Sequence, residues 1–467
     1  MSRNSLSRRQ FLRHVGVGAA SLAGVSLFSA CAPTSTPEVQ VVRETQVVKE
    51  TVQVTKEITA APPAPIRLTL WHHWGGTREP LMNKAAEDFT ARNPGLTIEL
   101  TLIPWDRKEE SILTAVAAGQ APDVLMLNAA EMPPYAMADA LIPIDDLVAQ
   151  TGIKPEDVYE SEWQATSYTG KIWGLPQTVG GAACLLFYNT QLFEEAGLDP
   201  GKPPTTWSET LAAAKALLKT GDKGEIVRLG ISGPVDMWWW LNYLAQNDAP
   251  WLSEDGREVK MDNEGAVEAL QWVVSLVDAQ GGQEKLSAFS SAAGDRDPFM
   301  AELQGMQMNG VWQFFLIKTN APELQFKSAV APNNKGKWHE GNYGPHLYVL
   351  PMGSKNKAVE ESWKLLLWFT RGAGQCTFLT DQLRPSPWRE CTDNSPLAKV
   401  ADYWPVVVEA LNTARPEPLT PLFNKFGSIW DEMGQRALLK ANTPAEAVKW
   451  AACEMAKAND AFWAKQS

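Results

Sequence analysis

Several signatures of known chemistry are missing from this chain of 467 residues. Its five cysteines, at positions 31, 184, 376, 391 and 453, are too few for a disulfide-dense scaffold. Its five histidines show no metal-ligand spacing, and no HExxH or CxxC motif occurs, so neither a metal nor another cofactor is expected. The motifs that hold nucleotide phosphates or a nucleophilic serine are missing as well. The sequence therefore lacks the usual motifs of nucleotide-binding and acyl-transfer enzymes.

The charge balance excludes another class of partner. Lys and Arg number 42 against 54 Asp and Glu, which gives a net charge of -12. No basic excess is available to neutralise a phosphate backbone, so nucleic acid is not an expected partner. Hydrophobic residues make up 45% of the chain, enough to bury a core in each of the roughly two to four domains that this length allows.

The first thirty residues are typical of an export signal. Residues 1–30 contain four arginines and no acid, followed by a mild apolar stretch shorter than the roughly 20 residues of a permanent membrane span. Residues 7–13 resemble the twin-arginine export motif, and residues 27–31 resemble a lipobox in which Cys31 becomes the lipidated first residue. We therefore expect an exported protein that is lipid-anchored at the outer face of the cytoplasmic membrane. Ordinary cleavage with Cys31 unmodified stays open.

Residues 31–65 carry no globular pattern. Prolines bracket a degenerate repeat rich in Val, Thr, Lys and Glu, and no long apolar face is present. We interpret this segment as the lipid anchor followed by a tether. A short coiled coil is the alternative, because valines recur seven residues apart over two heptads.

From Ile66 onward, short apolar runs alternate with helical stretches. Strands are expected at 67–71, 96–103 and 123–127, with helices between them, which predicts two βαβ units and a parallel sheet. Such sheets bind ligands beyond the carboxyl ends of their strands. The turns that follow the first and third strands, with His73 and Trp74 and with Asn128, are therefore candidate binding segments.

A second alternating set of strands and helices follows residues 171–176. Further strands are expected at 184–188, 227–231 and 346–350, further helices at 204–218, 264–279, 358–370, 403–412 and 444–458, and a segment of unassigned type around 305–311. Chain size favours two lobes over one continuous core.

Tryptophan is unusually abundant, with 20 residues. Three of them are consecutive, from Trp238 to Trp240, and in a helix they spread over about 200°, which is wider than one core-facing stripe. At least one ring should therefore avoid the core and be available to a ligand. Asp236, Trp238 and Trp239 are the candidates here. The alternative is two core rings and one on the lobe surface.

Three other positions are candidate ligand contacts. Trp312 and Tyr343 lie beside Gly310 and Gly344, which would allow close approach of a ligand, although tight turns explain these glycines equally well. Gln177 follows a strand-like segment and can hydrogen-bond a hydroxyl, as can Asn128, which is equally compatible with an ordinary turn. Cys376 and Cys391 are compatible with a disulfide or with free thiols.

A series of short motifs carries a family resemblance. They are Leu68-Thr69-Leu70-Trp71, Ala121-Pro122-Asp123-Val124, Trp173-Gly174-Leu175-Pro176, Tyr188-Asn189 with Leu192-Phe193, Glu195-Ala196-Gly197-Leu198, Pro203-Pro204-Thr205-Thr206-Trp207 and Met308-Asn309-Gly310-Val311-Trp312. In this order the series resembles the extracellular solute-binding proteins of ABC importers, in their carbohydrate-binding branch.

The resemblance implies a fold and a division of the chain. The implied fold is α/β and two-lobed, like periplasmic binding proteins, each lobe a mainly parallel sheet flanked by helices, with strands that cross at a hinge. It assigns 66–180 to lobe 1, 181–311 to lobe 2, 312–354 to a return into lobe 1, and 355–467 to lobe 2 with the C-terminal helices.

The resemblance also implies a function without chemistry. The protein would capture a sugar or oligosaccharide by lobe closure and deliver it to an ABC permease as a monomer, and it would catalyse no reaction. Two alternatives stay open: a secreted glycan hydrolase or lyase with aromatic subsites, which needs paired carboxylates, and a scaffold lipoprotein without a small ligand. The sequence does not separate a sugar from a polyol.

Overall fold

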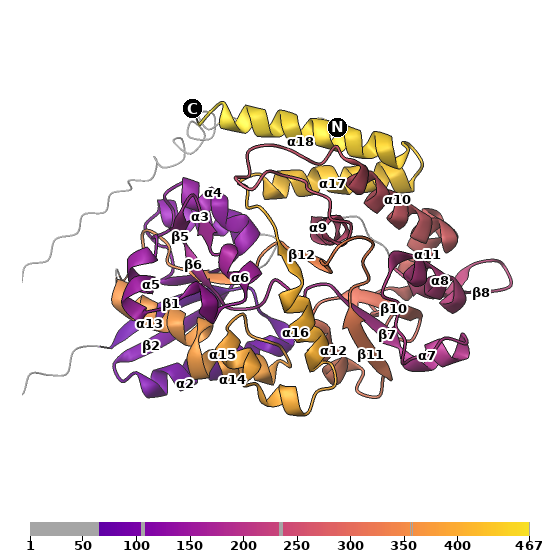
Figure 1. Cartoon of the computed structure of the whole chain (residues 1–467). Helices are drawn as coiled ribbons and strands as arrows, with labels where there is room; N and C mark the ends of the chain where they lie inside the picture. The colour runs from indigo at the N-terminus through magenta and orange to yellow at the C-terminus, as the bar shows by residue number, and fades with distance from the viewer. Residues whose placement is uncertain (1–64, 104–107, 233–236, 355, 357, 467) are drawn as a thin grey trace, which may run out of the picture. The chain divides into compact units, whose positions relative to one another are not determined.

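The computed structural model describes residues 65–103, 108–232, 237–354, 356 and 358–466. These residues belong to one compact unit. Their strands form two five-stranded sheets and two small two-stranded sheets. Figure 1 shows the two large sheets as the centres of two lobes, each flanked by helices. The expected signal, Cys31 and the tether up to residue 64 lie outside the described residues.

The first sheet contains both predicted βαβ units. Across the sheet its strands are β2 (Leu96–Leu102), β1 (Ile66–His72), β3 (Val124–Asn128), β13 (His346–Val349) and β6 (Gly174–Pro176). β1 pairs in parallel with β2 and β3, whereas β13 runs antiparallel to β3 and β6. β3 is buried along its whole length, as expected of a strand covered on both faces. The carboxyl ends of β1 and β3 therefore meet at one edge of the sheet.

The second sheet is mixed. Its strands, in order, are β11 (Phe326–Val330), β7 (Leu185–Asn189), β10 (Gln304–Asn309), β9 (Ile226–Ile231) and β8 (Lys219–Thr220). Only β9 and β10 pair in parallel, and the other three pairs are antiparallel. The expectation of a mainly parallel sheet is therefore wrong for this lobe. The chain reaches β7 from β6 of the first sheet, and the direction of β7 is set by its pairing with β10 and β11, which come much later in the sequence. The alternation of strands and helices along the sequence does not predict such pairing.

The helices and minor strands surround these sheets. The elements of the N-terminal half are η1 (Gly76–Arg78), α2 (Glu79–Arg92), α3 (Lys108–Ala117), η3 (Ala129–Glu131), α4 (Met132–Met137), α5 (Asp145–Thr151), η4 (Pro155–Asp157), α6 (Glu160–Gln164), β4 (Ser167–Tyr168), β5 (Lys171–Ile172), α7 (Thr190–Glu195) and α8 (Trp207–Leu217). Those that follow are α9 (Met237–Gln246), α10 (Glu264–Ala279), α11 (Gln283–Ala293), α12 (Trp312–Asn320), β12 (Glu340–Asn342), α13 (Val359–Thr370), α14 (Gly372–Asp381), α15 (Arg389–Asp393), η5 (Pro396–Lys399), α16 (Trp404–Asn412), β14 (Ala414–Pro416), α17 (Phe423–Leu438) and α18 (Pro444–Trp463).

The first lobe recruits helices from late in the chain. Leu70 of β1, Val124 of β3 and Tyr348 of β13 share a buried cluster with Phe369 of α13 and Phe378 of α14. Burial of an apolar side chain of this size contributes about 1.5–3 kcal/mol. These two helices are therefore part of the first lobe's core.

The path of the chain between the lobes differs from the expected division. In the stretch 312–354, α12 and β11 belong with the second sheet, and only β13 joins the first. In the stretch 355–467, α13 and α14 pack on the first sheet, and α17 and α18 pack in the second lobe. The amphipathic pattern of a helix shows that one face is buried, but it does not show which sheet that face covers.

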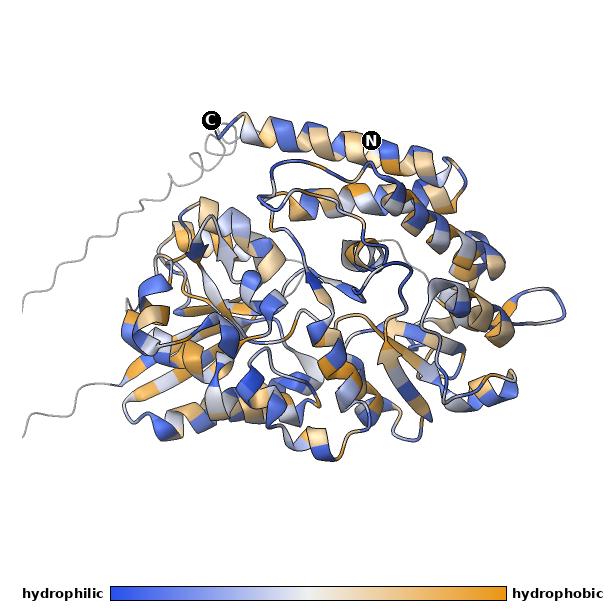
Figure 2. Cartoon of the chain, viewed as in Figure 1, coloured by the Kyte–Doolittle hydropathy of each residue, from blue (hydrophilic) through white to orange (hydrophobic). Residues whose placement is uncertain are grey.

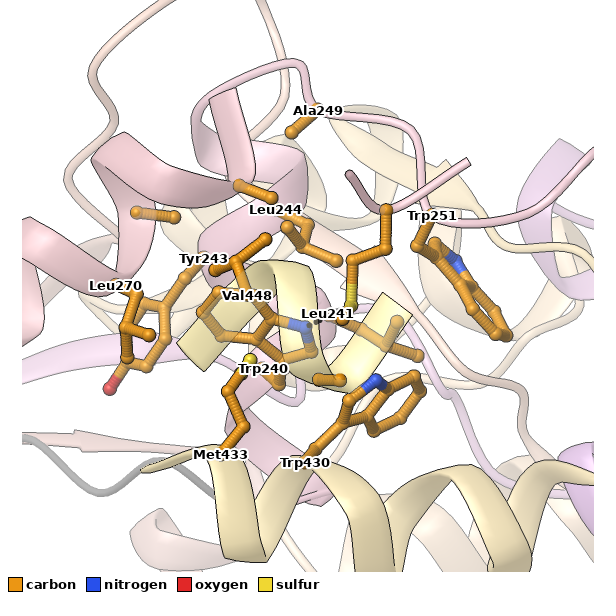
Figure 3. Close-up of a cluster of buried hydrophobic side chains, with 14 of the residues drawn as sticks. Trp240, Leu241, Tyr243, Leu244, Ala249, Trp251, Leu270, Trp430, Met433 and Val448 are labelled. Atoms are coloured by element: carbon orange, nitrogen blue, oxygen red, sulfur yellow. Dashed lines mark hydrogen bonds between the residues drawn. The ribbon is translucent and has the colours of Figure 1, made fainter. Parts of the chain in front are cut away.

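The second lobe has a helical core around α9. Figure 3 shows Trp240 and Leu241 enclosed by side chains from α10, α17 and α18, among them Trp430 and Val448. Trp240 and Leu241 are fully buried. Figure 2 shows hydrophobic and hydrophilic residues alternating along α17 and α18, as expected of helices with one face in this core.

Two buried glutamates hold a segment that crosses between the lobes. Residues 177–184 lead from β6 to β7. The carboxylate of Glu162 in α6 accepts hydrogen bonds from the N–H groups of Gly180 and Gly181, at 2.9 and 2.7 Å. The carboxylate of Glu340 in β12 accepts from the N–H groups of Ala182 and Cys184. These bonds satisfy the backbone of a segment that has no strand partner.

Residues 331–345 cross back to the first sheet and pack directly on the first crossing segment. A methyl group at Gly180 would overlap both the side chain of Asn342 and the backbone at Gly344. The two crossing segments therefore touch at a position where only glycine fits.

A disulfide joins Cys376 of α14 to Cys391 of α15. This settles the pairing that the sequence left open, and it ties together the two ends of the loop 382–388. Within the ranges given above, no helix is both long and apolar enough to cross a membrane.

Candidate ligand-binding cleft

A cavity of about 390 Å³ lies where the two lobes and the crossing segments meet. Trp74, Asn128 and His346 line it from the first sheet, and Trp239 and Trp312 line it from α9 and α12 of the second lobe. The crossing segments add further residues, including Gly180 and Tyr343. The volume is within the roughly 300–1,000 Å³ typical of small-molecule sites.

Trp74 lies just beyond the carboxyl end of β1, where the parallel sheet predicts a binding edge. It is buried, and its ring stacks on Phe378 with 5.3 Å between ring centroids. An edge contact to His346, at 6.2 Å, joins it to β13. These contacts fix the ring, so the cleft wall on this side is preformed.

Asn128 ends β3 and caps the short helix η3. Its Oδ1 accepts a hydrogen bond from the Ala130 N–H at 3.0 Å, and its Nδ2 donates to the Gly344 carbonyl at 3.4 Å. The side chain thus lines the cavity while bridging β3 to a crossing segment. Asn128 therefore both caps a turn and lines the cavity, which the sequence analysis had treated as alternatives.

The consecutive tryptophans of α9 have different environments. Trp240 is fully buried in the second-lobe core, whereas Trp239 is partly buried and lines the cavity. Trp239 also packs against both the helical core and the core of the second sheet. The side chain of Trp238 and the whole of Asp236 lie outside the described residues.

Trp312 begins α12 and reaches the cavity from the second lobe. A methyl group placed on Gly310 would overlap the six-membered ring of Trp312. Gly310 therefore makes room for this ring. Tyr343 lines the cavity from the second crossing segment, next to Gly344 in the left-handed region with φ of 110°.

Two predicted residues do not line the cavity. The ring nitrogens of His73 lie 3.3 Å from the Ile103 carbonyl and 2.9 Å from the Met126 carbonyl, between strands of the first sheet. Successive side chains at a strand end point in opposite directions, so only one of His73 and Trp74 can face the cleft. Gln177 is fully buried, and its side-chain amide has no hydrogen-bond partner among the described residues.

The prediction from sequence missed two arginines in the cavity wall, Arg78 and Arg384. Their guanidinium carbons lie 5.6 and 5.5 Å from the ring centroid of Trp74. Burial lowers the pKa of Arg384 to about 9, with a further contribution from the charge of Arg78, and burial also lowers the pKa of Arg78. Both remain cationic at neutral pH. Arg78 follows a turn that was already singled out, whereas no local pattern marks Arg384.

A second cavity, of about 610 Å³, is less suited to hold a ligand. Trp463 is in its wall, but the guanidinium of Arg257 lies 4.5 Å from that ring and covers it. Glu417, also in its wall, is already bonded to Arg415 and Trp251. Across the ranges that the structure describes, no cluster of three or more His, Cys, Asp or Glu side chains is arranged to hold a metal ion.

The amino-acid sequence matches the profile of a known protein family. The sequence profile of the bacterial extracellular solute-binding proteins matches residues 74–375, well over half of the chain. The chain belongs to this family. This solute-binding protein therefore belongs to a family of extracellular binding proteins.

Among the proteins similar to this solute-binding protein is a binding protein of Brucella abortus (strain 2308), 26% identical over 318 residues, or 66% of this chain and 72% of that protein. The sn-glycerol-3-phosphate-binding periplasmic protein of Shigella flexneri serotype 5b (strain 8401) is 28% identical over 196 residues, 40% of this chain and 43% of that protein. The sugar-binding protein MalE of the phytopathogen Xanthomonas citri has a TM-score of 0.73 at 21% identity, covering 86% of this chain and 100% of that one. The last likeness confirms the two-lobed α/β fold.

Proposed function

We propose that this protein is the substrate-binding component of an ABC importer and captures a sugar or a related hydroxylated solute. One observation carries the proposal: aromatic rings from both lobes, Trp74 on one side and Trp239 and Trp312 on the other, line a single cavity. Sugars present apolar C–H faces and polar hydroxyl edges. Flat rings suit the faces, and a few convergent polar groups, such as the Asn128 amide, suit the edges.

The mechanism that we propose is closure of the lobes around the ligand. A ligand that contacts Trp74 and Trp312 at once makes its full set of contacts only when the lobes approach each other. The crossing segments at Gly180 and Asn342 are the places where a small change in backbone angles would move the lobes. The closed, loaded form would then be the one that the permease accepts.

The named ligands of the similar proteins support this class of solute. One binds sugar and another binds sn-glycerol 3-phosphate, and both compounds are hydroxylated. The proposal therefore extends to polyols and their derivatives.

The residues that line the cleft support a function in binding better than a function in catalysis. Glycoside hydrolysis uses two carboxyl groups on either side of the scissile bond. The part of the cavity wall that the structure describes contains no aspartate or glutamate. Incubation of the protein with a glycan panel, followed by chromatography, should release no product; a released product would instead support the hydrolase or lyase alternative.

We further propose that Cys31 anchors the protein to the outer face of the cytoplasmic membrane after twin-arginine export, and that the protein acts as a monomer. Cys31→Ala should move the protein from the membrane fraction to the soluble extracytoplasmic fraction. Replacement of Arg8 and Arg9 by Lys should block export. Retention at the membrane in the Cys31 variant would contradict the lipid anchor.

The main test is a ligand screen on the full-length protein. Thermal unfolding is measured with neutral mono- and oligosaccharides, polyols, their phosphorylated and carboxylated derivatives, and peptides. A ligand at 100 times its dissociation constant should stabilise the protein by about 2.7 kcal/mol. Native mass spectrometry of freshly purified protein would identify a co-purifying ligand by its mass. Stabilisation by peptides alone, or by no compound, would contradict the proposal and favour a scaffold without a small ligand.

A further inference from the structure

The cleft carries positive charge in a chain that is negative overall. The chain has a net charge of -12, yet Arg78 and Arg384 both line the cavity, and the described part of its wall contains no carboxylate. Neither arginine forms an ion pair with any of the described residues. The positive charge of the cleft is therefore not balanced by any of the described side chains that line it.

Arg384 is the more exceptional of the two. Only 6% of its surface is exposed, and its buried Nε has no hydrogen-bond partner within the described part of the chain. Buried arginines are normally paired, because an unpaired buried charge loses its hydration without compensation. Arg78 is close enough for its charge to lower the pKa of Arg384, so the two cations repel each other.

The structure holds Arg384 in place despite this cost. Its backbone N–H donates to the Leu379 carbonyl at 3.0 Å. It lies in the loop whose ends are tied by the disulfide between Cys376 and Cys391. Its guanidinium rests near the Trp74 ring, a contact that favours a cation. The group is therefore preorganised, and its Nε donor is left over for a ligand, since it has no partner among the described residues.

A guanidinium presents donors in a planar fork that matches carboxylate and phosphate oxygens. We propose that the physiological ligand of the cleft is a hydroxylated compound that carries an anionic group, a phosphate monoester or a carboxylate, and that Arg384 and Arg78 bind this group. Trp239 and Trp312 would contact the uncharged part of the same ligand. The proposal rests on the function proposed above, and it narrows the substrate class from neutral sugars to sugar or polyol acids and phosphates.

The test uses matched ligands that differ only in charge. Isothermal titration calorimetry on the full-length protein compares glycerol with glycerol 3-phosphate, and glucose with glucose 6-phosphate and with glucuronate. A third set compares a neutral disaccharide with its uronate. Within a set that binds, the anionic member should bind at least tenfold more tightly. Preference for the phosphate or for the carboxylate would distinguish the two sources of negative charge.

The variant Arg384→Gln removes the buried charge and keeps a polar side chain. It should weaken binding of the anionic ligand about 100-fold, as expected for loss of hydrogen bonds to a charged group, and weaken binding of the neutral member of the same set much less. Arg78→Gln, at a less buried position, should also reduce the preference for the anionic over the neutral ligand. This variant provides the test if Arg384→Gln fails to fold. Arg92→Gln is the matched control, because Arg92 is exposed on α2 and lies 5.5 Å from the ring of Trp368, outside the cavity.

A titration with inorganic phosphate at constant ionic strength tests the anion site separately from the sugar-binding function. Neutral ligands that bind as tightly as the anionic ones, with no effect of Arg384→Gln, would overturn the anionic class and leave the sugar-binding function standing. Binding of phosphate that depends on Arg384, with no binding of any hydroxylated ligand, would support the anion site and overturn the sugar function. Absence of binding by phosphate and by every ligand would overturn both.

Discussion

Replacement of Trp312 by alanine tests the cleft with little disturbance to the core. The ring lines the cavity but belongs to none of the hydrophobic clusters found among the described residues. Trp239, by contrast, packs against two of those clusters, so its removal would mix a loss of binding with a loss of stability. Trp312→Ala is therefore expected to lower affinity while the melting temperature stays nearly unchanged.

The expected magnitude follows from the area of ring that a ligand can cover. An aromatic side chain buries about 150–250 Å² in all, and because Trp312 is already partly buried, on the order of 50 Å² remains for a ligand. With a similar area of ligand, roughly 100 Å² leaves water, worth about 2.5 kcal/mol at ~25 cal/mol per Å². This corresponds to an increase in Kd of about 60-fold.

The assay is calorimetric titration with the tightest ligand of the screen, alongside thermal unfolding. Trp338→Ala is the control, because Trp338 is also partly buried but lies outside the cavity, with the Lys337 ammonium 4.2 Å from its ring. Unchanged affinity in Trp312→Ala would refute the assignment of this ring to the ligand site.

A second variant tests the same ring without deleting it. Gly310→Ala introduces a methyl group that would overlap the Trp312 indole and displace it. Its affinity should fall in the same direction as that of Trp312→Ala. Full affinity in Gly310→Ala would show that the indole can move aside without leaving the ligand.

Three further predictions concern the scaffold. Replacing Cys376 and Cys391 by serine opens a bridge with a sequence separation of 15, and should lower the free energy of unfolding by about 3 kcal/mol; an unchanged denaturation midpoint would contradict this. Burial raises the pKa of Glu162 to about 7 and of Glu340 to about 8, from an ordinary value of 4.5. The stability that these groups contribute is fully present below pH 4.5 and is lost as the pH rises through about 7 for Glu162 and about 8 for Glu340. The melting temperature should therefore fall between pH 4.5 and about 8, and it should fall less in Glu340→Gln. A pH series of melting curves will check this. Gly180→Ala forces the crossing segments apart and should lower the free energy of unfolding by on the order of 1–3 kcal/mol; an unchanged free energy of unfolding would contradict this.

Part of the cleft was predictable because it follows from one local pattern. Two βαβ units predict parallel strands, and parallel strands determine the edge at which their loops gather, so spacing alone indicated Trp74 and Asn128, which line the cavity. The helical spread of three consecutive tryptophans likewise indicated that one ring would leave the core. The structure buries Trp240 and places Trp239 at the cavity.

Local patterns in the amino-acid sequence predicted the alternation of strands and helices, the edge of the first sheet at which the cavity lies, and the aromatic rings in the cavity wall. Contacts between distant segments decide that α13 and α14 complete the first lobe, that β7 runs antiparallel to its neighbours, and that Arg384 and Arg78 both lie near the Trp74 ring. Local patterns report which face of an element is apolar, because that face repeats with the period of the element. They do not report which distant element covers the face, since that choice depends on packing and charge across hundreds of residues.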